Sequence, residues 1–330
     1  MQLNKNIKNF INYFLGPLLF IWLSYSIFRQ IQKQPQLEES WSHIRQSFQS
    51  YNIIYLLGAL ILIFANWGIE AWKWLISVRT FYPIKFIQAF KAVLSGVSFS
   101  VTMPNRVGEY LGRIVYLPEG NRLKTISITL VGSFAQLLVT IITGTIGLII
   151  LKSKLVDSFP QFRIWYQFAL YSLILLALIM LLMYFNVAGL VTVFNRWIKN
   201  KKYNYLVEAV QNFHSKLLLQ LLLLSLLRYA VFVVQYIFVF YLFQVNIDAA
   251  QIAITMSVVF LAMAVVPSIA LVEVWLRGEL SIKLIGLFSS NSLGIGFTSV
   301  TVWFINLILP AIIGSLLLLN LRIFKKNEKH

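Results

Sequence analysis

The chain has 330 residues, of which 59% are hydrophobic and only 12% are charged; its net charge is +17 and its mean hydropathy +0.77. Soluble domains carry about 25% charged residues, so this composition excludes an ordinary soluble protein and indicates a polytopic membrane protein. The absence of cysteine excludes disulfides and thiolate metal sites, and the three histidines show no ligand spacing, so we expect neither a metal centre nor a cofactor.

Six apolar runs are long enough to cross a membrane, because about 18 consecutive apolar residues suffice for a spanning helix. The first run follows Lys5 and Lys8, and no small-residue cleavage site comes after it, so we interpret it as a retained helix rather than a cleaved signal. The predicted spans cover residues 11–28, 52–79, 125–151, 164–186, 217–243 and 293–320. We expect them to form a single membrane domain over residues 1–330.

The placement of the basic residues predicts the direction of these spans. When the N-terminus is put in the cytoplasm, most of the 28 Lys and Arg fall in cytoplasmic segments, including the connector 187–216. Cytoplasmic loops carry such an excess in membrane proteins. We therefore expect a multi-pass protein of the cytoplasmic membrane with both termini inside, and the net positive charge indicates topology rather than a nucleic-acid partner.

Two further apolar segments are too short to cross. Ala92–Met103 covers roughly 18 Å as a helix, whereas the hydrocarbon core is about 30 Å thick. It ends at Pro104. The second segment, Ile252–Val266, ends at Pro267. Both patterns predict re-entrant helical hairpins, and the topology places the two on opposite sides of the membrane.

The two prolines open similar motifs, "MPNRVGEYLGR" and "VPSIALVEVWLRG". In each motif a glutamate follows the proline, and an arginine follows the glutamate by four residues. The order of the spans repeats as well, so the sequence predicts an inverted repeat of residues 1–151 and 164–320, a plan known from transporters. The expected fold is thus an all-α polytopic membrane protein with about six spanning helices and two re-entrant hairpins.

The charged residues of these motifs allow two interpretations. Glu109 with Arg113, and Glu273 with Arg277, share one helix face and are expected to pair. Either the pairs only close each hairpin, or the arginines also bind the anionic headgroup of a lipid, since guanidinium suits phosphate. Arg106 has no acid four residues before or after it, so we expect it to contact the phosphate.

Four polar residues inside the spans form a candidate polar path. Glu70 and Arg228 lie at similar depth in corresponding spans, so either they form an ion pair between the two halves or Glu70 pairs locally with Lys73. Gln136 and Asn306 fall near the middles of their spans. Each either satisfies a neighbouring helix or lines the path.

The motifs "SGVSFSVTMPNRVGEYLGR", "VVPSIALVEVWLRG" and "FINLILPAIIGSLLLL" resemble the flippase-like, or lysylphosphatidylglycerol synthase transmembrane, family. The chain departs from that family at Gln136 and Asn306, where the family often has arginine, and at 268–270, where it is usually rich in glycine. In aminoacyl-lipid synthases a soluble acyltransferase domain follows this kind of membrane region. Since this chain stops at His330, the resemblance implies a stand-alone translocation module without synthase activity. The positions that carry the resemblance are Pro104, Arg106, Gly108, Glu109, Arg113, Pro267 and Glu273.

The sequence therefore favours a translocator of an anionic or phosphate-bearing amphiphilic lipid, with no catalytic residue. Two alternatives remain: a membrane enzyme or enzyme subunit acting on a lipid-linked phosphate or glycan, and a scaffold for partner proteins. The chain has no GxxxxGK[ST] phosphate loop, no HExxH element and no paired carboxylate cluster that suggests glycosyl or phosphoryl transfer. The expected partners are anionic membrane lipids, together with a second copy of the chain or a membrane enzyme.

Overall fold

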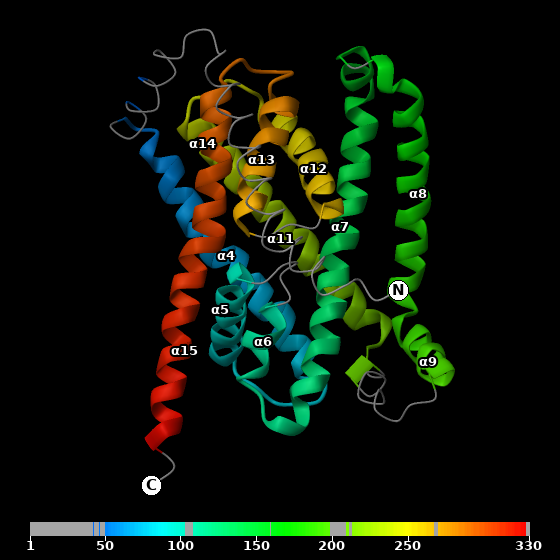
Figure 1. Ribbon diagram of the computed structural model, residues 1–330, viewed down its shortest axis with the longest axis vertical. Coiled ribbons are helices and arrows are strands. Elements are labelled where there is room, and N and C mark those ends of the chain that lie inside the picture. The colour runs from blue at the N-terminus through cyan, green and yellow to red at the C-terminus, as the bar shows by residue number, and fades with distance from the viewer. Residues whose placement is uncertain are drawn as a thin grey trace, which may run out of the picture.

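The computed structural model describes Ser42, Gln46 and residues 50–102, 108–158, 160–198, 209–210, 213–266 and 270–327. Every regular element in these residues is helical, which confirms the predicted all-α polytopic membrane fold (Figure 1). The helices are α4 (Ile53–Val78), α5 (Phe86–Thr102), α6 (Gly108–Ile114), α7 (Arg122–Ser158), α8 (Arg163–Phe185), α9 (Val187–Ile198), α11 (Ser215–Leu242), α12 (Ala249–Val265), α13 (Ala270–Ile285), α14 (Ser292–Trp303) and α15 (Leu309–Asn327), with short turns η3 (Glu119–Asn121) and η4 (Pro160–Phe162).

Five spans that the structure describes match five of the six predicted ones. They cover Ile53–Val78, Lys124–Ser158, Arg163–Phe185, Ser215–Leu242 and Ser292–Leu318. The remaining predicted span, 11–28, lies outside the described residues. α7 continues past the predicted end at residue 151: its 37 residues give a helix of about 55 Å, which is longer than the hydrocarbon core.

The last span contains a change of helix type. α14 runs into a π-helical segment, η6 (Phe304–Ile308), and then into α15. The N–H of Leu309 donates to the carbonyl of Phe304, five residues earlier, which is the spacing that defines a π-helix. The segment places Asn306 inside the widened part of the helix.

The two short apolar helices each lie beside the helix that follows them. α5 packs against α6 and α12 packs against α13, the first pair in the lower half of the view and the second in the upper half (Figure 1). The residues that join each pair, Pro104 and Pro267 among them, lie outside the described residues. α5 begins earlier than the apolar run predicts, because the charged side chain of Lys91 is exposed and does not interrupt the helix.

The predicted halves pack together in a reciprocal way. α4 of one half lies against α11 of the other, α5 lies against α15, and α7 lies against α12. The last two contacts are close ones made at glycine: a Cβ on Gly314 would overlap the backbone of Leu94, and one on Gly144 would overlap Leu261. The first short helix of each half is therefore held by the last span of the other half.

Two apolar cores occupy the interior. The first surrounds α4, α5 and α7 and includes Trp74, Leu138 and Tyr184. The second surrounds α11 and α12 and includes Phe240 and Met256. Apolar side chains of α8, by contrast, are mostly exposed, as expected of a helix that faces lipid.

Candidate functional site

Two glycines bring α6 against the backbone of α5. A Cβ on Gly112 would overlap the backbone of Ser95 and Gly96, and a Cβ on Gly108 would overlap that of Phe99. Small residues allow helices inside a membrane to approach this closely. This close packing fixes the orientation of α6 and therefore the positions of Glu109 and Arg113.

Glu70 of α4 lies at the centre of the buried charges in this region. Its Oε1 accepts a hydrogen bond from Nη2 of Arg113 at 2.9 Å. Its Oε2 contacts Nζ of Lys73 at 2.9 Å and Nη1 of Arg228 at 3.0 Å. The two alternatives for Glu70, a local pair with Lys73 and a pair with Arg228 across the halves, therefore both exist in the structure.

The predicted pair between Glu109 and Arg113 is confirmed, with 3.3 Å between Oε2 and Nη2. Arg113 is 3% exposed at its side chain and Glu109 18%, so the arginine is the buried partner. The same Nη2 makes the shorter contact with Glu70, so Glu109 is the second partner rather than the first. The Nε of Arg113 is also buried, and none of the described residues accepts a hydrogen bond from it.

Arg228 extends the site toward the middle of the bundle. Its Nε donates to Oδ1 of Asn66 at 2.9 Å, and Nδ2 of Asn66 donates to Oδ1 of Asn306 at 2.8 Å. Asn306 in turn donates to the carbonyl of Val302 at 3.0 Å. The guanidinium also lies 5.1 Å from the ring of Trp67, within cation–π range. Helices of both predicted halves thus meet at Arg228.

We call the five charged residues Glu70, Lys73, Glu109, Arg113 and Arg228 the Glu70 cluster. Its three cations outnumber its two carboxylates, so the cluster carries a formal charge of about +1. Inside a membrane an uncompensated charge is expensive, and such residues mark substrate paths by default. The cluster is therefore able to accept one more anion at low cost.

The corresponding region of the second half is electrically balanced. Arg277 donates to Glu273 on the same helix, as predicted, and its Nη1 donates to the hydroxyl of Tyr236 at 3.1 Å. The ring of Phe232 lies 5.7 Å from the guanidinium. In each half, the arginine that follows a glutamate by four residues contacts a residue on a long neighbouring span. In the first half that residue is Glu70, and in the second it is the neutral Tyr236.

The other predicted site residues lie in different places. Asn306 joins the network through Asn66, whereas Gln136 does not: it is half-buried on α7, and its Oε1 has no hydrogen-bond partner among the described residues. Arg106 falls within residues 103–107, which are outside the described residues. No group of described His, Asp or Glu residues is arranged to hold a metal ion.

Three contributors to these contacts were not found by sequence reasoning. Asn66 lies four residues before Glu70 on the same helix face, and this spacing was the available signal. Ser225, which accepts from Lys73 at 3.3 Å, and Tyr236 lie within an apolar helix and give no sequence signal of their role.

Comparison with known proteins identifies the family. No curated protein and no solved structure is similar enough to match the chain. Residues 13–274 match the family described as "Lysylphosphatidylglycerol synthase TM region", and this stretch contains the whole Glu70 cluster. Since the match extends over well more than half of the sequence, the chain belongs to the lysylphosphatidylglycerol synthase transmembrane region family.

Proposed function

We propose that the protein translocates an anionic lipid across the cytoplasmic membrane. The observation that carries the proposal is the surplus positive charge of the Glu70 cluster, which is buried where the two halves of the chain meet. Membership of a family named for a lipid-modifying enzyme's membrane region supports a lipid-related role. The phosphate of a headgroup supplies the anion that the cluster lacks.

Arg228 is the cation in the cluster that a headgroup reaches first. Its side chain is 17% exposed, whereas those of Lys73 and Arg113 are each 3% exposed. It lies thirteen residues into α11, about 20 Å from the start of that helix, and so near mid-membrane. A guanidinium at this depth offers bidentate hydrogen bonds to phosphate, which lysine does not.

The reciprocal packing of the halves supports transport by alternating access. Exchanging the halves leaves the set of contacts α4–α11, α5–α15 and α7–α12 unchanged. We propose that α5–α6 and α12–α13 are re-entrant hairpins of an inverted repeat, with both termini in the cytoplasm. In transporters of this plan one repeat rocks against the other around a central site, and Arg228 and Glu70 join the repeats at such a point.

The test is lipid translocation by the purified chain in vesicles. Fluorescent phosphatidylglycerol is placed in the inner leaflet, and its appearance outside is followed by quenching with dithionite. We expect Arg228→Gln to slow translocation about tenfold or more, because a charge-assisted hydrogen bond contributes about 1.5–3 kcal/mol. The matched control is Lys85→Gln, which removes an equal charge at an exposed side chain outside the cluster.

Two results would contradict the proposal. One is transfer of phosphatidylglycerol by the wild-type protein no faster than in protein-free vesicles. The other is an unchanged rate for a well-folded Arg228→Gln protein. Mass analysis of the recovered lipid separates translocation from catalysis, because an enzyme acting on a lipid-linked phosphate would change the mass of its substrate.

A further inference from the structure

A separate cavity lies at one end of the molecule, where α7 passes through η4 into α8. Its volume is about 200 Å³. Lys152, Tyr166 and Arg163 line it together with Gln167 and the last turns of α7. None of these residues belongs to the Glu70 cluster or its hydrogen-bond network.

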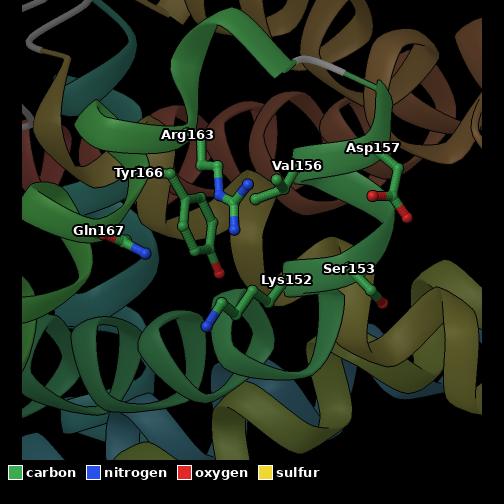
Figure 2. Close-up of a pocket in the computed structure, with 7 residues that line it drawn as sticks. All are labelled: Lys152, Ser153, Val156, Asp157, Arg163, Tyr166 and Gln167. Carbon is green, nitrogen blue, oxygen red and sulfur yellow. The ribbon is translucent and has the colours of Figure 1, made fainter.

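The cavity gathers positive charge. Figure 2 shows the guanidinium of Arg163 and the phenol of Tyr166 turned toward the ammonium group of Lys152, whereas the carboxylate of Asp157 lies apart from them beyond Val156. Across the described part of the chain, no acidic side chain forms an ion pair with Lys152 or Arg163. Two cations therefore face one small space, and Asp157, the carboxylate that also lines it, forms an ion pair with neither.

The position of the cavity corresponds to the level of lipid headgroups. The apolar run of α7 ends at Leu151 and that of α8 begins at Ile164, so Lys152 and Arg163 lie directly past the two runs. Trp165, which is 69% exposed, lies on the adjoining turn. Aromatic residues at this depth are typical of the membrane–water interface. The exposed apolar face of α8 continues from this level along the acyl chains.

A tyrosine fixes the cavity wall. The hydroxyl of Tyr166 donates to the carbonyl of Leu148 on α7, which ties the start of α8 to the preceding span. Arg163 and Lys152 are thereby held on facing helices. The neighbouring Lys154 is directed elsewhere, since its Nζ lies 3.9 Å from the centroid of the Phe288 ring. Lys152 and Arg163 therefore face the cavity, whereas Lys154 does not.

We infer that this cavity binds the phosphate of an anionic phospholipid, held between Lys152 and Arg163, as a second lipid site that is separate from the Glu70 cluster. The amide of Gln167 borders the same space and offers a hydrogen-bond donor to a headgroup oxygen, while the phenol of Tyr166 forms part of the wall. The inference does not depend on translocation, because it concerns only occupancy of a site at the membrane surface.

The experiment uses a fluorescent reporter in the cavity wall. The chain has no cysteine, so Ser153→Cys accepts a single environment-sensitive dye beside the cavity. The labelled full-length protein, in neutral detergent, is titrated with short-chain phosphatidylglycerol, short-chain phosphatidylcholine or inorganic phosphate. We expect a saturable response to phosphatidylglycerol. Lys152→Gln or Arg163→Gln should weaken its apparent affinity about fivefold each, since a cation near the lipid surface contributes about 1 kcal/mol. Lys154→Gln, an equal loss of charge, should leave it unchanged.

The three ligands and the three substitutions distinguish a phospholipid site from its alternatives. Saturation by inorganic phosphate with the same dependence on Lys152 and Arg163 supports the anion site but assigns it to free phosphate. Equal weakening by all three substitutions overturns the inference, because it would show only a general effect of charge. A response to phosphatidylcholine equal to that for phosphatidylglycerol, or no response to any ligand, overturns it as well.

Discussion

Neutralising Glu70 tests whether this one buried carboxylate holds three cations in place. Each of its contacts, at 2.9–3.0 Å, contributes about 6 kcal/mol of Coulomb attraction at an effective dielectric constant near 20. Desolvation and repulsion among the cations cancel most of that sum. Breaking one partner of a buried ion pair costs about 3–5 kcal/mol, and we expect Glu70→Gln to lower the stability by that amount.

The assay is the temperature at which the detergent-solubilised protein loses its monodisperse peak on size-exclusion chromatography. Glu109→Gln is the matched comparison, because it removes the same charge from a more exposed residue that makes one longer contact with Arg113. We expect its cost to be about 1 kcal/mol. Adding Arg228→Gln to Glu70→Gln should recover part of the loss, since it removes a cation that has lost its counter-charge. Equal losses for Glu70→Gln and Glu109→Gln, or strictly additive losses in the double variant, would show that Glu70 does not hold the three cations.

Further variants test the contact of Arg277, the packing of α5 on α6, and the topology. Tyr236→Phe should cost about 1.5–3 kcal/mol, measured by the same thermal assay, because the buried Arg277 loses its hydroxyl acceptor; the full stability of the wild type in that variant would show that the bond contributes nothing. Gly112→Ala should abolish a monodisperse peak because its Cβ meets the backbone of α5, whereas Gly68→Ala, with open space around it, should not; similar behaviour of the two would contradict the close packing of α5 and α6. Single cysteines at Gly120 and Asn246 should react with an impermeant maleimide from the cytoplasm and from outside, respectively, and labelling of both from one side would contradict the topology.

The sequence was sufficient for those features that depend on local pattern. Apolar run length predicted five described spans to within a few residues, except at the end of α7. The four-residue spacing predicted the pairs Glu109–Arg113 and Glu273–Arg277 because residues so spaced are neighbours on any helix.

Features that depend on how distant helices pack were not predictable in the same way. The partners of Glu70 lie on α4, α6 and α11, so their meeting depends on the crossing of α4 with α11 and on the approach of α6. Gln136 and Asn306 gave equal signals, yet only Asn306 faces the network. An amide in the middle of a span shows that a partner is needed but not on which side of the helix that partner lies.

The π-helical segment η6 rotates α15 about the helix axis relative to α14, so the two parts of the last span face different directions. One additional residue in a turn rotates everything beyond it by about 100° relative to an uninterrupted α-helix. On one side of the segment α14 packs against α11 and α13, and on the other side α15 packs against α5. One continuous span thereby presents two differently oriented packing faces, one to helices of its own half and one to a helix of the other half, and the extra residue sets the angle between those faces.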